Sequence, residues 1–598
     1  MSRILSSFAR IARPCWQTPS GVVSPRRWIF QHARSVTAPR IRQYLSRASQ
    51  HVGSKGCASA ASNTYTEPTI YALSTASGRA AIAVIRVSGS ASLQIYNALC
   101  PGKKPPKSRV ATVRTLYDPS ESPSQDSVLD SSALVLYFEG PTTATGEDVL
   151  ELHVHGGPAI VKAVLAAISR CRTSTGSMIR YAEPGEFTRR AFMNNRLDLT
   201  QVESLGDTLA ADTEQQRRLS VRGTTGSLAK QYEAWRHQLL YARGELEALI
   251  DFSEDQHFDE SPSELMISVA AQVEVLRKSL LIHSQNAVRG ELLRHGIKVS
   301  LLGAPNAGKS SLLNRIVGRE AAIVSNEAGT TRDIVEIGLD LGGYLCRFGD
   351  TAGLRRAVEA DLGSGTSTKK INQIEQEGMR RAKARAEESD LVVVVFSFEE
   401  TENGRVCLNL DPEVCQMAER LKSEGKNVVV VVNKADLVHD GTSVGVDAIQ
   451  HVRNRLPLVA DESIHVLSCL DTDEARNALR SFLKGLVTEF ERLTAAISPE
   501  LDIDGHSPDQ SIWQESLGAS ERHRLLLDQC IAALDQFMSE AQVELKSTMN
   551  EGEEADIVLA AEHLRAAADC LAKITGKGES GDVEEVLGVV FEKFCVGK

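Results

Sequence analysis

The chain has 598 residues, of which 42% are hydrophobic and 24% charged, and its formal net charge is −11 at pH 7. This length predicts several domains rather than one, and the acidic balance argues against a general affinity for nucleic acid. No uncharged apolar run approaches the roughly 18 residues of a transmembrane segment. The eleven cysteines include no C-x-x-C pair, which argues against a disulfide framework or a zinc site.

The first 66 residues differ in composition from the rest. Residues 1–66 contain nine Arg, one Lys and no acidic residue, so that Glu67 is the first carboxylate. Apolar residues such as Ile4 and Phe8 are spaced among arginines such as Arg3 in a Ser-rich background. This pattern predicts a mitochondrial transit peptide. A disordered basic tail, or an arm that binds nucleic acid, is the alternative.

Residues 67–197 alternate strand-like segments, among them 81–87 and 149–155, with glycine turns and predict a domain of mixed α and β structure. Arg86 and Glu151 fall on strand faces that we expect to be partly buried. They either pair with each other or face a polar ligand, because a carboxylate can accept two N–H bonds from an amidine-like heterocycle edge such as a pterin presents. His153 and His155 lie on the same strand face as Glu151, but two histidines without a third ligand are weak evidence for a metal site.

Apolar residues recur at helical spacing in four segments, two before residue 290 and two after residue 500. The stripes are Leu228, Tyr232, Trp235 and Leu239; Val269, Val273, Leu276 and Leu280; Leu527, Ile531, Leu534 and Met538; and Ile557, Ala561, Leu564, Ala568 and Leu571. Each stripe needs a partner face. The sequence therefore predicts an all-α bundle built from residues 198–295 and 491–598, with residues 296–490 inserted as a separate domain.

The inserted region begins with a glycine-rich loop between an apolar strand and a helix. The loop reads Gly303-Ala304-Pro305-Asn306-Ala307-Gly308-Lys309-Ser310, and Ser311 continues into the helix. In such a loop the backbone N–H groups point at a polyphosphate, the Lys309 ammonium reaches the β- and γ-phosphates, and the Ser310 hydroxyl binds Mg²⁺. The helix N-terminus adds unpaired N–H groups and its positive dipole end.

Further motifs follow in the order typical of a GTPase. They are Gly329-Thr330-Thr331, with Thr331 as a second Mg²⁺ ligand; Asp350-Thr351-Ala352-Gly353, near Mg²⁺ and the γ-phosphate; Asn433-Lys434-Ala435-Asp436; and Ser468, after the apolar run 464–467. The Asp436 carboxylate can accept two N–H bonds from guanine, whereas adenine offers the wrong donor pattern. The sequence therefore predicts a Ras-like P-loop GTPase domain that binds GTP and Mg²⁺.

Several segments outside these motifs carry a resemblance to a known family. They are Ala81–Gly89 (AIAVIRVSG), Thr145–Pro158 (TGEDVLELHVHGGP), Pro184–Asp198 (PGEFTRRAFMNNRLD) and the terminal Phe594–Lys598 (FCVGK). With the inserted GTPase domain they resemble the MnmE/TrmE tRNA-modification GTPases from about residue 68 to 598. Together with the basic leader, the chain looks like a mitochondrial member, of multidomain α/β plus all-α class.

This resemblance implies a specific reaction. In the family, the N-terminal domain dimerises and binds 5,10-methylene- or 5-formyl-tetrahydrofolate, and the GTPase domains dimerise through a potassium ion. With an FAD-containing flavoprotein of the MnmG type, the family modifies C5 of the wobble uridine of certain tRNAs, here mitochondrial ones in the matrix. The folate supplies one carbon, and glycine or taurine supplies the amine of the carboxymethylaminomethyl- or taurinomethyl-type product.

The resemblance also assigns ligand-binding positions. The implied folate contacts are Arg86, Glu151, Arg196 and Lys598; Arg196 replaces a lysine of bacterial members, which keeps the charge but alters its geometry. The implied K⁺ ligands are Asn306, Ser325, Glu327 and Thr330. This ion would stand in for the arginine finger of other GTPases, which is worth on the order of 10³-fold or more in rate.

The implied catalytic residues are Lys309 and Thr331 at the nucleotide, a water-positioning Glu375, and Cys595 beside the folate. Glu377 is a rival to Glu375 because residues 355–370 include an extra Gly/Ser/Thr-rich stretch, and a solvated helix charge is the alternative to both. Cys595 is either a buried thiol or a thiolate active in the one-carbon chemistry.

Two other functions compete with tRNA modification. One is a mitochondrial ribosome-assembly GTPase without base-modifying chemistry, although such proteins usually append a basic RNA-binding module. The other is a folate-sensing scaffold whose GTPase is only a switch.

Overall fold

The computed structural model describes residues 67–172, 178–252, 262–319, 322–324, 337–349, 380–401, 405–438, 443–499, 510–547, 556–577, 590–591, 594 and 596–597. The predicted leader lies outside these residues. So do the segments that carry Thr331, the Asp350 motif and Glu375.

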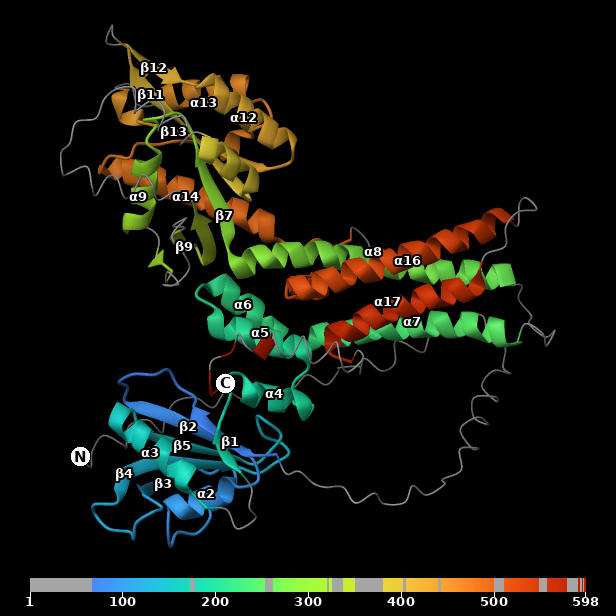
Figure 1. Cartoon of the computed structure of the whole chain (residues 1–598). Coiled ribbons are helices and arrows are strands. Elements are labelled where there is room, and N and C mark those ends of the chain that lie inside the picture. Colours follow the sequence, from blue (N-terminus) through green and yellow to red (C-terminus); the bar gives the residue numbers. More distant parts are fainter. Residues whose placement is uncertain are drawn as a thin grey trace, which may run out of the picture. The chain divides into compact units, whose positions relative to one another are not determined.

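The N-terminal part is a six-stranded sheet with helices against it (Figure 1). Its strands run in the order β3-β4-β5-β2-β1-β6, and only the β1–β6 pair is parallel. The strands are β1 (Thr69–Leu73), β2 (Ile82–Ser88), β3 (Thr112–Tyr117), β4 (Val128–Phe138), β5 (Val149–His155) and β6 (Ile179–Tyr181); the helices are α2 (Ser92–Leu99), α3 (Pro158–Arg170) and α4 (Glu186–Met193). The expected strands at 81–87 and 149–155 are confirmed within a residue at each end.

Side-chain alternation along these strands separates two faces. On β5, Leu150, Leu152 and Val154 are buried in a core with α2 and α3. The opposite face carries Glu151, His153 and His155, which become progressively more exposed along the strand. This second face is the one that can receive a ligand or another protein surface.

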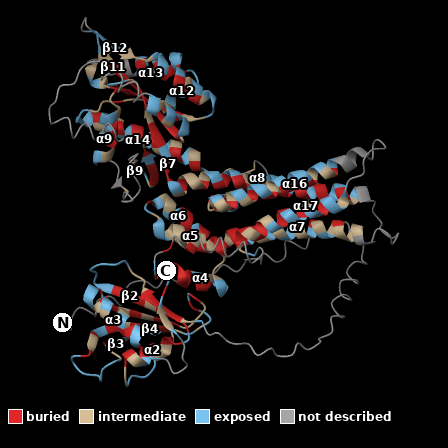
Figure 2. Cartoon of the chain, viewed as in Figure 1, coloured by how far each residue is buried: buried red, intermediate tan, exposed pale blue. Residues whose placement is uncertain are grey.

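The helical part contains a bundle of four long helices, α7, α8, α16 and α17 (Figure 1). Its helices are α5 (Leu199–Ala210), α6 (Glu214–Gly223), α7 (Ser227–Phe252), α8 (Pro262–His295), α15 (Gln510–Ser516), α16 (Glu521–Ser547) and α17 (Ile557–Thr575). All four predicted apolar stripes lie in one hydrophobic core, with Ile531, Met538 and Ile557 partly buried and the other members buried. Figure 2 shows the buried residues of the four long helices facing one another.

The inserted part is an eight-stranded sheet with helices, interrupting the bundle between α8 and α15. The strand order is β14-β13-β11-β7-β10-β9-β8, and β12 pairs with β11. The strands are β7 (Ile297–Leu302), β8 (Ala322–Ile323), β9 (Ile337–Leu341), β10 (Tyr344–Phe348), β11 (Leu391–Glu400), β12 (Val406–Asn409), β13 (Asn427–Asn433) and β14 (Ile464–Val466). The helices are α9 (Lys309–Arg319), α12 (Pro412–Ser423), α13 (Ser443–Arg455) and α14 (Asp473–Thr494), with short 3₁₀ turns η2 (Ala435–Leu437) and η3 (Asp461–Ser463).

Five neighbouring strands of this sheet, β14, β13, β11, β7 and β10, are parallel. The central strands β11 and β13 carry near-continuous Val runs, as a parallel sheet covered on both faces requires. The predicted class, α/β plus all-α in several domains, is confirmed.

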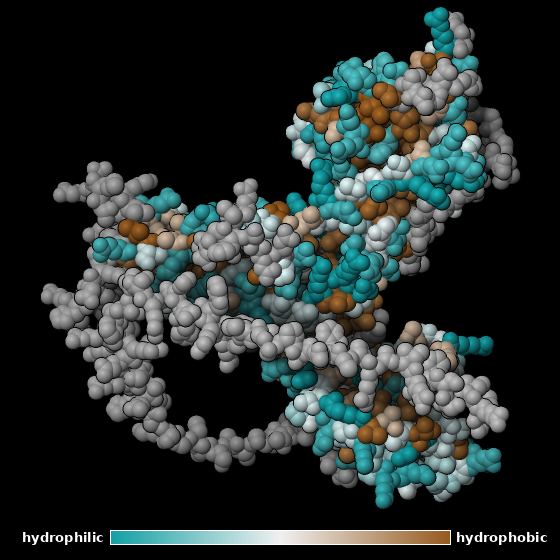
Figure 3. All heavy atoms as spheres, turned by 180° about the vertical axis from the view of Figure 1, so that it is seen from behind, coloured by the Kyte–Doolittle hydropathy of each residue, from teal (hydrophilic) through white to brown (hydrophobic). Residues whose placement is uncertain are grey.

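The outer surface is mixed in character. Figure 3 shows hydrophilic residues interspersed with hydrophobic patches on the face that it presents. Among the described helices, none is long and apolar enough to cross a membrane.

Candidate functional site

The phosphate-binding loop lies where the sequence predicts it, between the end of β7 and the start of α9. Lys309 Nζ donates to the carbonyl oxygens of Gly303 (2.8 Å) and Ala304 (2.7 Å). Asn306 (φ 62°) and Gly308 (φ 95°) adopt left-handed backbone conformations. The ammonium of Lys309 is thus held against a tightly curved loop, and a loop of this kind can offer its backbone N–H groups to a polyphosphate.

Gly308 is required for close approach as well as for its φ angle. A Cβ at residue 308 would lie 2.0 Å from Asn433 Nδ2, a distance that no packing tolerates. Asn433 Nδ2 donates to the Ala307 carbonyl oxygen at 3.0 Å. Asn433, the first residue of the predicted guanine motif, therefore helps to fix the position of the phosphate loop.

The guanine side of the site is built at the ends of β13 and β14. Lys434 takes a left-handed conformation (φ 60°) directly after β13, and Asp436 follows in η2. The Ser468 hydroxyl donates to Asp436 Oδ1. The structure brings Asn306, Lys309, Asn433, Asp436 and Ser468 into one region around the parallel strand ends, where open α/β sheets bind ligands.

Several predicted site residues lie outside the described residues. They are Ser325, Glu327, Thr330, Thr331, Asp350, Thr351, Ala352, Gly353, Glu375, Glu377, Cys595 and Lys598. The Ser310 and Ser311 side chains are exposed at the first turn of α9, which is compatible with Ser310 as a Mg²⁺ ligand.

In the N-terminal part, Arg86 and Glu151 are opposite each other across β2 and β5. Arg86 Nε and Nη2 both donate to Glu151 Oε1, at 3.0 and 2.9 Å. The other carboxylate oxygen, Oε2, lies 3.4 Å from His153 Nε2. The Arg86 guanidinium also lies 5.9 Å from the centre of the Phe187 ring of α4. The ion pair between Arg86 and Glu151 is therefore compatible with a bound polar ligand, because both Arg86 bonds go to Oε1 and not to Oε2.

Arg196, a third predicted folate contact, is fixed by a different partner. Its Nε donates to the Thr143 carbonyl oxygen at 2.9 Å. The same β4–β5 loop accepts a bond from Asn194 Nδ2 to the Thr145 carbonyl oxygen at 2.7 Å. The segment after α4 thus holds the loop that precedes Glu151.

A buried charge cluster in this region was missed by the sequence reasoning. Arg190, 5% exposed, donates to both oxygens of Glu147 (3.0 and 2.9 Å) and to Glu186 (3.1 Å). Burial by itself raises the pKa of Glu186, but hydrogen bonds from Arg180, the Glu183 N–H and Arg190 outweigh it and leave this pKa below its usual value. Periodicity gives no signal for such a cluster, because it depends on which loop faces the helix.

The two histidines of β5 do not share a partner. His153 faces Glu151, whereas His155 Nδ1 lies 2.9 Å from Asp130 Oδ1. No group of three or more potential metal-binding side chains occurs among the residues that the structure describes. The weak metal alternative gains no support.

The C-terminal tail lies against the N-terminal part. Val596 forms an antiparallel bridge with Pro184, and the Ser74 hydroxyl donates to the Gly597 carbonyl oxygen at 2.9 Å. Phe594 packs with Phe591 and with α5 through Leu199 and Val202. The residues on both sides of Cys595 are thus anchored, one to α5 and the other beside α4.

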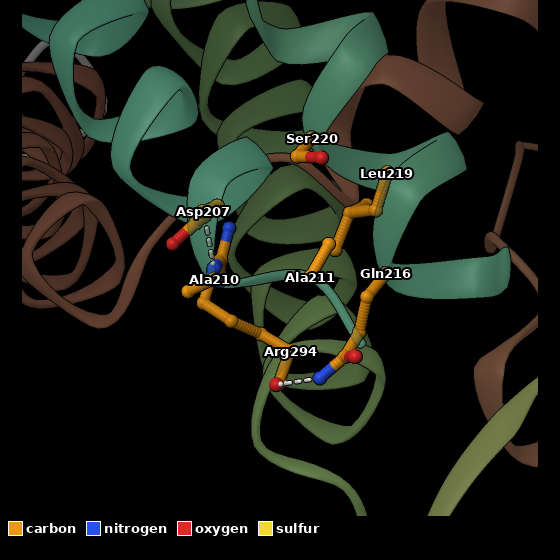
Figure 4. A pocket seen from close by; sticks show the side chains of 7 residues that line it. All are labelled: Asp207, Ala210, Ala211, Gln216, Leu219, Ser220 and Arg294. Atoms are coloured by element: carbon orange, nitrogen blue, oxygen red, sulfur yellow. Dashed lines mark hydrogen bonds and ion pairs between the residues drawn. The ribbon is translucent and has the colours of Figure 1, made fainter. Parts of the chain in front are cut away.

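A small cavity lies elsewhere, among α5, α6 and α8 (Figure 4). It is lined by Asp207, Ala210, Ala211, Gln216, Leu219, Ser220 and Arg294. None of the predicted nucleotide or folate residues lines it, and its volume of about 40 Å³ admits only a few water molecules. It is not a ligand site for a nucleotide or a folate.

Comparisons with known proteins agree with this architecture. The family model described as GTP-binding protein TrmE N-terminus matches residues 69–196, and the MnmE helical domain model matches residues 199–595. The tRNA modification GTPase MnmE of Parvibaculum lavamentivorans is 38% identical over 89% of this chain and 100% of its own length.

Two eukaryotic relatives are similar over comparable lengths. The mitochondrial tRNA modification GTPase MSS1 of Saccharomyces cerevisiae is 35% identical over 90% of this chain and 94% of its own. The mitochondrial 5-taurinomethyluridine-[tRNA] synthase subunit GTPB3 of Homo sapiens is 36% identical over 89% and 93%. The chain is therefore a P-loop GTPase and belongs to the MnmE/TrmE family of tRNA-modification GTPases.

Proposed function

We propose that this protein is a potassium-stimulated GTPase that acts with an FAD-containing flavoprotein on C5 of the wobble uridine of mitochondrial tRNAs. A tetrahydrofolate supplies the carbon, and the product is of the carboxymethylaminomethyl or taurinomethyl type. The named relatives support a role in tRNA modification. The observation that carries the folate part is Glu151, partly buried on the sheet face opposite the core, where Arg86 binds Oε1 and Oε2 has the longer contact of 3.4 Å to His153.

The residues at this face fit a reduced pterin. A pterin presents adjacent N–H donors that a carboxylate can accept in pairs, and the flat Phe187 ring lies beside the Arg86 guanidinium. The tail that flanks Cys595 reaches the same domain through Pro184 and Ser74. A bound folate would supply the one-carbon group, while Arg86, Glu151, Arg196 and Lys598 would orient it.

We further propose that the protein forms homodimers through the N-terminal domain and works in the mitochondrial matrix. Ile82 and Val113 are exposed hydrophobic residues of the sheet, and a second copy could cover such positions. The proposed domain limits are 67–197, 198–295, 296–490 and 491–598, after a leader of residues 1–66. The mitochondrial relatives in yeast and human support the location.

The decisive experiment compares wobble-uridine modification in cells that lack this protein with cells that carry the wild type or a Lys309→Ala variant. We expect the modified nucleoside to disappear from mitochondrial tRNA in the deletion and to stay absent with Lys309→Ala, as measured by mass spectrometry. Normal wobble uridines in the deletion would contradict tRNA modification and would favour ribosome assembly.

Potassium dependence is tested at Asn306. Asn306 has a left-handed backbone conformation at the bend of the phosphate loop. It is the one predicted K⁺ ligand that lies within the described residues, and its side-chain oxygen is the atom that would bind the ion. We expect GTP hydrolysis to be faster in K⁺ than in Na⁺, and Asn306→Ala to remove this difference. Asn306→Gly is the matched control for strain, because glycine adopts a φ of 62° freely but lacks the oxygen. Both variants should lose K⁺ stimulation, and stimulation retained in either would exclude Asn306 as a ligand.

A further inference from the structure

Arg315 lies on α9, two turns beyond the phosphate-binding Lys309. Its Nη1 donates to Asp471 Oδ1 at 3.1 Å and its Nη2 donates to the Leu470 carbonyl oxygen at 2.5 Å. The Arg315 side chain is 18% exposed, although that of Asp471 is about half exposed. A planar guanidinium that meets two acceptors from one short loop fixes that loop in position as well as in orientation.

The loop that Arg315 holds is the one that touches the predicted guanine-recognising carboxylate. The Leu470 N–H donates to Ser468 Oγ at 3.1 Å, and the Ser468 hydroxyl donates to Asp436 Oδ1. The backbone joins the same two loops, because the Ala435 N–H donates to the Leu467 carbonyl oxygen at 3.2 Å. A continuous set of hydrogen bonds therefore runs from α9 through residues 468–471 to Asp436.

We propose that Arg315 is a positioning residue for guanine specificity, which it exerts by fixing residues 468–471 so that the Ser468 hydroxyl sets the orientation of the Asp436 carboxylate. The proposal rests on the assignment of Asp436 as the acceptor for guanine. Arg315 does not touch the base in this arrangement. It links α9, which follows the phosphate loop, to residues 468–471 beside the predicted guanine-binding Asp436.

The physical reason is the freedom of an exposed carboxylate. Asp436 is exposed and follows a left-handed residue in a short 3₁₀ turn, so without a partner its side chain would sample several rotamers. Ordering it when the nucleotide binds would cost conformational entropy. The Ser468 hydroxyl accepts from the Leu470 N–H while Arg315 binds the Leu470 carbonyl oxygen, and a hydroxyl held in this way orders the carboxylate beforehand. Preorganisation of this kind increases affinity without a new contact to the ligand.

The test measures dissociation constants of the full-length protein for GTP and for ITP, which lacks the exocyclic 2-amino group of guanine. In Arg315→Gln we expect GTP affinity to fall about tenfold, the size of one charge-assisted hydrogen bond partly lost. ITP affinity should fall less, because ITP makes one bond fewer to Asp436. The ratio of GTP to ITP affinity should therefore fall several-fold.

A merely structural role of Arg315 would give a different result. Loosening of α9 would weaken the common triphosphate contacts, so that GTP and ITP affinities would fall equally. Such an equal fall, or no change in either affinity, would overturn the proposal. Arg453→Gln is the control variant, because Arg453 on α13 pairs with Asp461 at 3.3 Å on the surface of the same domain. Its ratio of GTP to ITP affinity should equal that of the wild type.

Two further variants keep the test decisive. Asp471→Ala removes one acceptor of Arg315, which Arg476 shares at 3.1 Å. It leaves the bond from Arg315 to Leu470, so it should shift the ratio in the same direction by less. If Arg315→Gln lowers the melting temperature, the ratio in Asp471→Ala decides. Asp436→Asn tests the underlying assignment, because it should exchange GTP preference for XTP preference, and an unchanged preference would refute the guanine assignment rather than the role of Arg315.

Discussion

At the scale of single residues, Glu151 shows how a structural ion pair can remain available for ligand binding. Both Arg86 nitrogens reach the same oxygen, Oε1, rather than forming a two-oxygen fork. Among the residues that the structure describes, Oε2 has only the longer contact of 3.4 Å to His153. Because an ionised carboxylate offers about four acceptor positions, Glu151 retains capacity for a donor pair from a heterocycle.

Glu151→Gln should therefore weaken folate binding without affecting the nucleotide site. The change preserves size but replaces one acceptor oxygen with a donor NH₂ and removes the charge. We expect affinity for 5-formyl-tetrahydrofolate to fall at least about tenfold, since each hydrogen bond to a charged group is worth roughly 1.5–3 kcal/mol. Isothermal titration calorimetry measures this, with GTP affinity as an internal reference.

The matched control for this change is Glu139→Gln, an exposed carboxylate just beyond the end of β4. It should leave both affinities unchanged. Equal folate affinity in Glu151→Gln and wild type would show that Glu151 serves only its pair with Arg86.

At the scale of secondary-structure elements, sequence periodicity predicted the helices of the bundle and their buried faces, because a stripe such as Leu228, Tyr232, Trp235 and Leu239 must be covered. It could not predict the polar contact inside that core. Tyr232 Oη and His283 Nε2 are 2.9 Å apart, both side chains are buried, and they come from α7 and α8. A histidine on a helix gives no signal of the side chain that will face it from another helix.

The same histidine predicts how the stability of the bundle depends on pH. Burial lowers the pKa of His283 from 6.5 to about 3, and Tyr232 and Trp235 pack edge-on against its ring. The folded ring therefore stays neutral in a range where the unfolded one takes up a proton. Since the unfolded state binds more protons between about pH 6.5 and 3, stability is complete above this window and falls as pH falls through it.

We expect this residue to contribute a loss of up to about 1.4 kcal/mol per pH unit below pH 6.5. Urea unfolding between pH 7.5 and 5, followed by tryptophan fluorescence, measures it. The double variant Tyr232→Phe/His283→Phe removes the titration without leaving a buried hydroxyl unpaired, so its stability should fall less steeply. Replacement of the exposed His451 by Gln should leave the wild-type slope, and parallel slopes in all three proteins would refute the prediction.

At the scale of the whole molecule, the order of the parts followed from the sequence, whereas the contacts between distant segments did not. The insertion of a GTPase into a helical bundle was predictable because apolar stripes on both sides lacked partners. Ser74 donates a hydrogen bond to Gly597, 523 residues away, and Arg522 donates one to Glu203. Both contacts depend on the paths of the loops that bring distant segments together. Motif spacing predicts the guanine-binding residues, but it does not reveal the link from Arg315 to Leu470.

Arg294 at the end of α8 makes several such contacts at once. Its guanidinium reaches Asp207 of α5 (2.6 Å), Glu291 of its own helix (2.5 Å) and the carbonyl oxygens of Gly518 (3.2 Å) and Ala519 (3.3 Å). Its own carbonyl oxygen accepts a bond from Gln216 of α6, at the edge of the cavity in Figure 4. The helix therefore ends in a charged joint that holds α5, α6 and the turn before α16, immediately before β7 leads to the phosphate loop.

Removal of this joint should destabilise the fold more than removal of any surface ion pair. Arg294→Met keeps most of the aliphatic stem but leaves the Asp207 carboxylate without this partner and Glu291 with His295 alone, at an expected cost of about 3–5 kcal/mol. Lys278→Met, at an exposed position of the same helix that pairs with Glu274, should cost no more than about 0.5 kcal/mol. Urea midpoints of the two variants measure the difference, and a stability of Arg294→Met within about 1 kcal/mol of the wild type would mean that the joint forms without its central charge.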